Sequence, residues 1–243
     1  MQLVIYTIVF FIVIGGVGMY FGNRKVNRSI ARHRWLKYFV YILITSFVVI
    51  SIWFYFFLPV AGFIILMGYY ELSRTIYSNQ RSALTLFIYS LVASGFIFYA
   101  LKFKREFQFF TYLQILAFDA FSQVTGQLLG KKLITPRISP TKTLEGLLGG
   151  IFFCVLAALL TSNWMNMTFS TAIMFGLFTS ITGFSGDLLA SFYKRIVKIK
   201  DYSNLLPGQG GFIDRFDSFM MAALSYTIIY LLAPGIFRYE YSN

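Results

Sequence analysis

Long apolar segments recur along almost the whole chain. Eight of them approach or exceed the roughly 18 to 20 residues that a helix needs to cross a bilayer. They cover about 3–22, 36–57, 60–77, 82–101, 107–125, 147–162, 171–193 and 219–236. Because lipid offers no hydrogen bonds to the backbone, such segments must be helical. The sequence therefore predicts an all-α integral membrane protein, a polytopic bundle of about eight transmembrane helices with polar loops.

The composition supports one membrane domain over residues 1–243. Hydrophobic residues make up 58% of the chain and charged residues 12%, against about 25% charged residues in soluble domains. The formal charge of +12 does not point to nucleic acid, because basic residues in a membrane chain mark cytoplasmic loops and contacts with anionic head groups. We expect membrane lipid as a partner and no nucleic acid.

Lysine and arginine are concentrated in the segments 24–37, 126–146 and 194–218. The positive-inside rule places these segments in the cytoplasm and the N-terminus outside. This scheme has one conflict, a short basic cluster that falls on the outer side: Lys102, Lys104 and Arg105. Either one span is miscounted or one segment is re-entrant. We expect the chain in a bacterial cell (inner) membrane, with its active-site loops in the cytoplasm.

Cysteine and histidine are too scarce for several common kinds of site. Cys154 is the only cysteine and lies inside an apolar run, and His33 is the only histidine. A disulfide framework and a thiolate zinc site are excluded. A zinc site or a Ser-His-Asp triad would have to be built around His33 in a basic loop, and we discount both.

The carboxylates are clustered. Six of the nine lie in or beside two polar regions, 119–146 and 187–217: Asp119, Glu145, Asp187, Asp201, Asp214 and Asp217. Carboxylates at the membrane edge are energetically costly and so mark candidate functional sites.

A helical segment 187–198 would place a carboxylate and several cations in one stripe. Asp187, Ser191, Lys194, Arg195 and Lys198 are separated by offsets that return to nearly the same helical face. A lone carboxylate at this depth needs a cation or a metal ion. The alternative is a helix end whose cations reach the head groups while Asp187 pairs with a neighbouring helix.

A glycine-rich turn precedes two more carboxylates. The segment 207–211 reads Pro-Gly-Gln-Gly-Gly, and Asp214 and Asp217 follow at an offset that shares one helical face. Glycine lets backbone N–H groups approach an anion, and carboxylates beside cations suit a divalent metal that holds phosphates. The alternative is a turn before a helix whose N-terminus Asp214 and Asp217 stabilise.

The other polar region resembles a nucleotide P-loop only superficially. Gly126 and Gly130 are one residue too close, and Lys132 stands where Ser or Thr should bind magnesium. Further on, Ser139, Lys142 and Thr143 offer hydroxyls and an ammonium before an apolar span. The alternative for Ser139 and Thr143 is capping of the helix that follows.

The order of these motifs resembles the phosphatidate cytidylyltransferase (CDP-diacylglycerol synthase) family. The C-terminal signature of that family is similar to Ser191-x-x-Lys194-Arg195, Lys200-Asp201, Leu206-Pro207-Gly208-x-Gly210-Gly211 and Asp214-Arg215-Phe216-Asp217. Its Ser-Pro-x-Lys-Thr-x-Glu-Gly element is similar to 139–146, and its upstream Asp and Gly spacing to Asp119, Gly126, Gly130 and Lys131. The resemblance covers about the C-terminal half of the chain.

The resemblance implies an enzyme that condenses CTP with phosphatidate, with Mg²⁺, to give CDP-diacylglycerol and pyrophosphate. It implies metal ligands at Asp187, Asp214 and Asp217, with Asp119 and Asp201 as further candidates. It implies phosphate contacts at Lys142, Lys194, Arg195, Lys200 and Arg215, and substrate contacts at Ser139, Thr143, Gly210 and Gly211. A homodimer is left open.

Four positions depart from the family pattern: Gln127, Ala190, Tyr193 and Gln209. The family has a basic residue, Glu, an aliphatic residue or Phe, and His at these positions, respectively. The second pKa of a phosphate monoester is near 6, so a lipid phosphate needs no strong base at neutral pH. Gln209 could then replace the histidine as a hydrogen-bond donor.

Two other functions stay open. A CTP-dependent lipid-alcohol kinase would use a hydroxyl nucleophile, which benefits from a base that this sequence supplies poorly. A catalytically silent protein that binds anionic lipid would explain the four departures. A transporter is disfavoured because the charged residues gather in loops rather than along the midplane of several spans.

Overall fold

A computed structural model describes residues 2–24, 26–76 and 82–237, so Lys25 of the first basic segment lies outside the described residues. The described residues contain one α-helix at each of the eight apolar segments. These are α1 (Gln2–Asn23), α2 (Arg28–Trp53), α3 (Phe57–Ile76), α4 (Ser82–Lys102), α5 (Arg105–Leu129), α6 (Leu144–Ser162), α7 (Phe169–Ile196) and α8 (Ile213–Leu232). Two short 3-10 helices follow α6 and α8: η1 (Asn163–Met165) and η2 (Pro234–Phe237).

The first of the two polar regions is not a plain loop. Two short antiparallel strands, β1 (Leu133–Thr135) and β2 (Ser139–Thr143), form a hairpin between α5 and α6. Its register pairs Leu133 with Thr143 and Thr135 with Ser139. The all-α prediction thus holds for the long elements, and the hairpin is a small addition at one end of the helices.

Four helical segments in the described ranges are long and apolar enough to cross a membrane: Arg28–Trp53, Ala83–Lys102, Leu144–Met165 and Phe169–Ile196. They expose large apolar side chains, among them Phe47, Phe87, Phe152 and Ile181. Exposed apolar surface of this extent is typical of a protein in contact with lipid. The chain is therefore an α-helical membrane protein.

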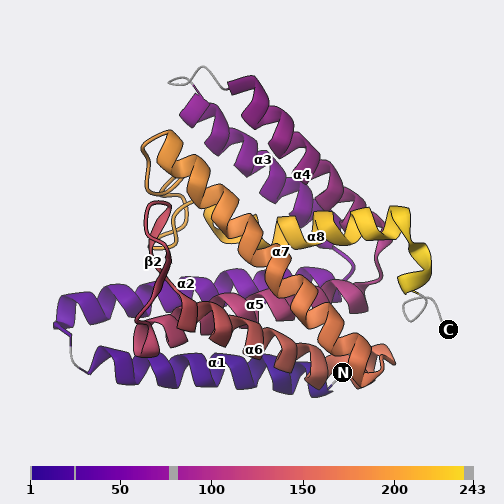
Figure 1. Cartoon of the computed structure of the whole chain (residues 1–243), viewed down its shortest axis with the longest axis horizontal. Coiled ribbons are helices and arrows are strands. Elements are labelled where there is room, and N and C mark those ends of the chain that lie inside the picture. The colour runs from indigo at the N-terminus through magenta and orange to yellow at the C-terminus, as the bar shows by residue number, and fades with distance from the viewer. Residues whose placement is uncertain (1, 25, 77–81, 238–243) are drawn as a thin grey trace.

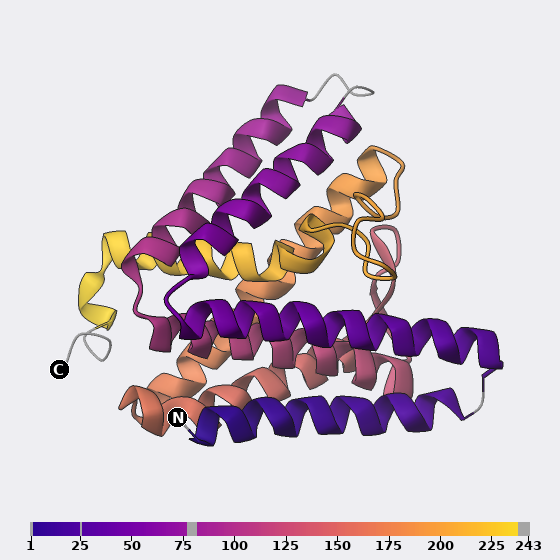
Figure 2. The ribbon, with the colours of Figure 1, turned by 180° about the vertical axis from the view of Figure 1, so that it is seen from behind.

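The helices form two groups that meet at α8. Helices α1, α2, α5 and α6 run side by side, α7 crosses them obliquely, and the α3–α4 pair lies on the other side of α8 (Figure 1). The end of α1, the hairpin and the end of α7 lie toward one side of the molecule. The start of α1 and η2 lie toward the opposite side in both views (Figure 2).

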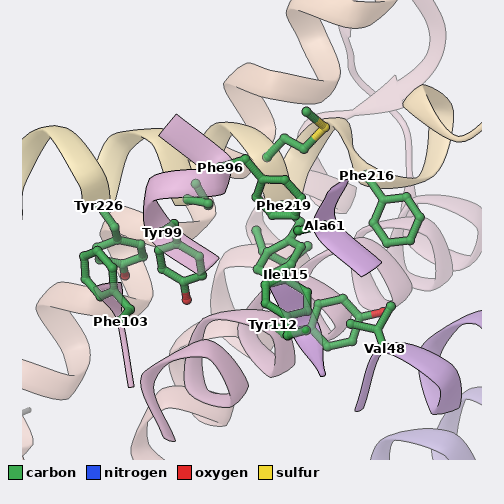
Figure 3. Close-up of a cluster of buried hydrophobic side chains, with 14 of the residues drawn as sticks. Val48, Ala61, Phe96, Tyr99, Phe103, Tyr112, Ile115, Phe216, Phe219 and Tyr226 are labelled. Atoms are coloured by element: carbon green, nitrogen blue, oxygen red, sulfur yellow. The ribbon is translucent and has the colours of Figure 1, made fainter. Parts of the chain in front are cut away.

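Aromatic side chains fill the core around α8. The Phe219 ring centroid lies 5.3 Å from that of Phe96 and 5.0 Å from that of Tyr112. Figure 3 shows these side chains within the buried cluster. Tyr226, further along α8, shares a hydrogen bond of 2.6 Å with the Thr179 hydroxyl of α7. Edge-to-face ring packing and a satisfied buried hydroxyl both stabilise this arrangement. Helix α8 is thereby held against α4, α5 and α7.

Arg105, from the basic cluster on the predicted outer side, lies among aromatic rings. The Arg105 guanidinium stands 5.2 Å from the Trp53 ring and 4.6 Å from the Tyr55 ring, and its Nε donates to Glu106 at 2.8 Å. Trp and Tyr are enriched at membrane–water interfaces. This end of α5 thus has cation–π and acidic partners for Arg105.

Candidate active site

Residues from both polar regions meet where the hairpin, the end of α7 and the start of α8 come together. Lys142 Nζ of β2 lies 2.6 Å from Asp187 Oδ2 of α7, and the Ser191 hydroxyl donates to Asp187 Oδ1 at 3.4 Å. The sequence predicted either a cation or a metal ion at Asp187, and the structure places a cation there. That cation is Lys142, which lies 45 positions away along the chain.

A close approach of α7 to α8 places Asp187 beside Asp217. A Cβ at Gly186 would come within 2.6 Å of the Asp217 carbonyl oxygen and of the Met221 Cβ. Only glycine allows two helices to approach this closely. The residue after Gly186 is therefore held next to the first turns of α8.

Three carboxylates from three helices gather at this point. Asp119 of α5, Asp187 of α7 and Asp217 of α8 are close enough for their charges to interact. The Ser218 hydroxyl lies 3.4 Å from Asp119 Oδ1 and 3.5 Å from Asp217 Oδ1, so one hydroxyl contacts both carboxylates. The Ser218 N–H also donates to Asp217 Oδ1 at 2.7 Å. Like charges held together need a cation.

Cations surround the carboxylates. Arg215 and Lys142 attract Asp119, and Lys194 attracts Asp217. Arg215 also lies over the Tyr41 ring of α2, at 5.9 Å from the centroid. Its buried Nε finds no hydrogen-bond partner among the described residues. A buried guanidinium N–H without a partner is a candidate contact for a substrate phosphate.

Asp214 has different surroundings from Asp217. Its Oδ1 accepts from Lys194 Nζ at 2.5 Å, and its Oδ2 accepts from the N–H groups of Tyr202 and Gly211 at 2.8 and 2.9 Å. The Lys194 and Asp214 side chains are only 11% and 6% exposed. Asp214 thus holds the 202–211 segment against the end of α7. Asp214 and Asp217, both predicted as metal ligands, are therefore not equivalent.

The segment around Tyr202 packs on the end of α7. Lys194 Nζ lies 5.5 Å from the centroid of the Tyr202 ring, and the Tyr193 ring stacks on the same ring at 6.0 Å. The Tyr202 hydroxyl donates to the Ala190 carbonyl at 3.3 Å. Burial raises the pKa of Tyr202, so the phenol stays protonated at neutral pH. Two departures from the family pattern, Ala190 and Tyr193, therefore lie around one ring.

Other predicted residues have mainly structural contacts. Arg195 Nε donates to the Ile138 carbonyl of the hairpin at 2.9 Å. Thr143 Oγ1 accepts from the Gly146 N–H at 3.2 Å, which is the capping interaction considered for it. Ser139 is buried in β2, whereas Lys200 and Asp201 are exposed. The predicted stripe on α7 is wrong at Lys198, because the helix ends at Ile196 and Lys198 adopts a φ of 57°.

The glycine turn is tied to α2. Gln209 Nε2 donates to the Lys37 carbonyl at 2.6 Å. Gly210 has a φ of 85°, and a Cβ there would lie 2.9 Å from Asp214 Oδ2. Glycine is required at Gly210 for both reasons. The departure Gln209 thus links the turn to the first basic segment, whereas Gln127 is exposed near the end of α5.

Sequence reasoning missed Glu71 of α3, which anchors the start of α8. This carboxylate is 0% exposed. Its Oε1 accepts from the Ser203 hydroxyl at 2.6 Å and the Phe212 N–H at 2.8 Å, and its Oε2 accepts from the Ile213 N–H at 3.0 Å. The first N–H groups of a helix lack partners within the helix, and a carboxylate there also interacts favourably with the helix dipole. The one available signal was a carboxylate inside an apolar span.

We expect Glu71→Ala to lower the free energy of unfolding by about 1 to 3 kcal/mol, because it leaves buried donors unsatisfied. Glu71→Gln keeps one acceptor oxygen and should lose less. Denaturation by SDS in mixed micelles measures both changes. The control Glu106→Ala removes a carboxylate whose side chain is 33% exposed. Equal stability of Glu71→Ala and this control would contradict the anchoring role.

The donor chemistry of the site fits a magnesium ion. No group of three or more His, Cys, Asp and Glu residues is arranged to hold a metal ion in the part of the chain that the structure describes. Magnesium usually takes only one or two protein carboxylates, together with waters and substrate phosphates. Asp119 and Asp217, which share the Ser218 hydroxyl, provide two such carboxylates.

Comparison with known proteins shows the family of the chain. Residues 2–233 match the cytidylyltransferase family. Over 160 residues, the chain is 33% identical to a phosphatidate cytidylyltransferase of Staphylococcus aureus and 34% identical to one of Staphylococcus haemolyticus. Each alignment covers 64% of this chain and 62% of the relative. Since the family match extends over nearly all of the described residues, the chain belongs to the cytidylyltransferase family.

Proposed function

We propose that this protein is a membrane nucleotidyltransferase that condenses CTP with phosphatidate to give CDP-diacylglycerol and pyrophosphate. The observation that carries the proposal is the meeting of three carboxylates with Lys142 and Arg215 at one end of α7 and α8. The phosphatidate cytidylyltransferases to which the chain is similar support it. The reaction brings together anionic groups, and a site that alternates carboxylates and cations suits that task.

In the proposed reaction an oxygen of the lipid phosphate attacks the α-phosphorus of CTP. The new P–O bond forms as the bond between the α- and β-phosphates breaks, and pyrophosphate leaves with the electron pair. Arg215 and Lys142 would orient the phosphates, and Lys194, Arg195 and Lys200 remain candidate contacts for the leaving group. Asp119 and Asp217 would hold Mg²⁺, which supplies charge neutralisation when bound. Positioning and charge neutralisation do most of the work in such transfers.

Purified protein in detergent tests the proposal. We would incubate it with Mg²⁺, each labelled nucleoside triphosphate and either phosphatidate or a lipid alcohol. A nucleotide-linked lipid formed from CTP and phosphatidate is expected. Phosphorylation of the lipid alcohol would instead identify a kinase, and no product with any pair would favour the silent lipid-binding alternative.

The proposed role of Gln209 is hydrogen-bond donation rather than proton transfer. Gln209→Ala should then lower turnover much more than Gln209→His, because histidine can also donate to a phosphate or to the Lys37 carbonyl. General acid–base help is typically worth about 10² to 10⁴-fold where it operates. A pH profile of each variant separates the cases. Strong activation by Gln209→His, with a new ionisation between about pH 5 and 8, would contradict the donor role.

We also propose that all eight helices cross the membrane, with the hairpin and the 197–212 segment in the cytoplasm. Helices α1, α3, α5 and α8 are each at least 20 residues long. The start of α1 and η2 lie on the same side of the molecule, as an even number of crossings requires. The proposed location is the inner membrane of a bacterial cell. A homodimer is part of the proposal, and light scattering of the purified protein tests it.

Cysteine labelling tests the orientation. Single cysteines at Arg28, Arg137 and Asn204, which are all exposed, should resist an impermeant reagent in intact cells and react after the cells are broken. The native Cys154 is buried and gives little background. A cysteine at Tyr55, in the turn between α2 and α3, is the control that should react from outside. Ready labelling at Arg137 in intact cells would overturn the orientation.

A further inference from the structure

An apolar groove runs between α2 and α3, next to the proposed site. Its volume is about 260 Å³, and every side chain that lines it is hydrophobic. Ile44 and Val48 of α2 form one wall, and Val60 and Ile64 of α3 form the other. No polar atom of these side chains enters the groove, so its contents must be apolar.

One part of the groove lining belongs to the segment that carries the site. Leu206 lies just before the glycine turn, and Phe212 and Phe216 flank Asp214 and Arg215 in the sequence. Figure 3 shows Phe216 at the edge of the core cluster, on the side where Val48 lies. The groove is therefore continuous with the start of α8 rather than a separate surface.

A cation neighbours the lining of the groove. Arg215 directly precedes the groove residue Phe216 in the sequence, and its guanidinium lies over the ring of Tyr41 of α2. The buried Arg215 Nε has no hydrogen-bond partner in the described ranges. A guanidinium next in sequence to the lining of an apolar groove matches a molecule with an anionic head and a hydrocarbon tail.

The groove opens to the outer surface of the helices. Leu43 and Phe63, on its rim, are 54% and 50% exposed, and α2 is long and apolar enough to cross a membrane. A hydrocarbon chain could therefore enter sideways from the bilayer. The volume lies below the roughly 300 to 1,000 Å³ of ligand pockets that enclose a whole small molecule. It suits one chain.

We propose that this groove binds one acyl chain of the phosphatidate substrate, with the lipid phosphate at Arg215 and the second chain in the bilayer. The inference rests on the proposed function. It assigns a specificity role to α2 and α3, which lie outside the motifs around the carboxylates. The groove would then determine the selectivity for acyl-chain length, and Arg215 would bind the lipid phosphate.

Filling the groove tests the proposal. Ile44→Trp places an indole in it from a half-buried position. The KM for long-chain phosphatidate should rise about tenfold, the effect of losing roughly two buried methylenes. The KM for CTP and the turnover of dihexanoyl phosphatidate should not change. Leu91→Trp, on an exposed position of α4, is the matched control and should leave all these values unchanged. Equal KM values for long-chain phosphatidate in both variants would overturn the proposal.

Photo-cross-linking gives a readout that does not depend on turnover. Phosphatidate with a photoreactive group in one acyl chain should label 43–48 and 60–64 in the wild-type protein. Excess phosphatidate should suppress this labelling, and phosphatidylcholine should not. Equal suppression by both lipids would mean that bulk lipid fills the groove and would overturn the proposal. A loss of dimer mass in Ile44→Trp, with unchanged lipid labelling, would assign the groove to a second copy and overturn it too.

These measurements separate the inference from the proposed function. A wild-type protein that forms no nucleotide-linked lipid from either phosphatidate would contradict the proposed function, and the cross-linking would then decide the groove by itself. An active wild-type protein whose groove variants behave like Leu91→Trp would contradict the inference alone.

Discussion

Asp217→Asn should lower the rate of nucleotide-linked lipid formation by roughly two orders of magnitude or more, the scale on which loss of one preorganised charge-stabilising group acts. Asn has nearly the volume of Asp, so the packing of Gly186 against the Asp217 backbone should survive. The substitution removes the charge of one of the two carboxylates that contact the Ser218 hydroxyl. These two carboxylates are the proposed Mg²⁺ ligands. Turnover measured against Mg²⁺ concentration should show the largest loss at limiting Mg²⁺.

Glu106→Gln is the control for this experiment, because it removes a carboxylate charge in the first turn of α5, outside the group of Asp119, Asp187 and Asp217. The control should keep the wild-type dependence on Mg²⁺. Thermal unfolding of both variants in detergent shows whether they remain folded. Near-normal turnover of Asp217→Asn at limiting Mg²⁺ would contradict the metal assignment.

Lys194→Met should destabilise the protein by about 3 to 5 kcal/mol, because it leaves the Asp214 carboxylate buried without its cation. The two side chains are only 11% and 6% exposed, so solvent screens their interaction weakly. Adding Asp214→Asn should restore most of the lost stability. The amide removes the second charge but keeps an oxygen that can accept from the Tyr202 and Gly211 N–H groups.

Activity and stability should separate in the double variant. If Lys194 also contacts phosphate, the double variant should be folded but slow. Lys198→Met, an exposed position just after α7, is the control for loss of a lysine. Chemical denaturation in detergent compares the three proteins. A double variant as unstable as Lys194→Met would contradict the ion-pair explanation, and one with full turnover would contradict a phosphate contact at Lys194.

The sequence predicted the helices well because a bilayer requires segments of a certain length and hydropathy. Both properties can be read directly from the residues of each segment. All eight apolar segments coincide with helices, and the polar regions fall at helix ends. The hairpin between α5 and α6 was not predicted, because its residues lack the alternation of a half-buried strand. Helix α7 ends before Lys198, whose φ is positive, and beyond this residue the Tyr202 N–H donates to Asp214.

The residues that gather at the candidate site were also among those that the sequence predicted. Asp119, Asp187, Asp217, Lys142 and Arg215 were all candidates, because charged groups at membrane depth are costly and the motif order is specific. Their grouping was not readable, since it depends on contacts between α5, α7, α8 and the hairpin. Spacing placed Asp214 and Asp217 on one helical face, but it could not show that Lys194 and two backbone N–H groups occupy Asp214.

The sequence by itself determined the membrane class, the helical segments and the residue types of the candidate site, because these follow from local hydropathy and from the high energetic cost of burying charge. Only the tertiary structure decided which carboxylates meet. It also revealed Glu71 of α3 as the anchor of α8 and the groove between α2 and α3. Both depend on contacts between helices distant in the sequence, and the side-chain pattern of one helix does not specify its neighbour when lipid and protein are equally apolar.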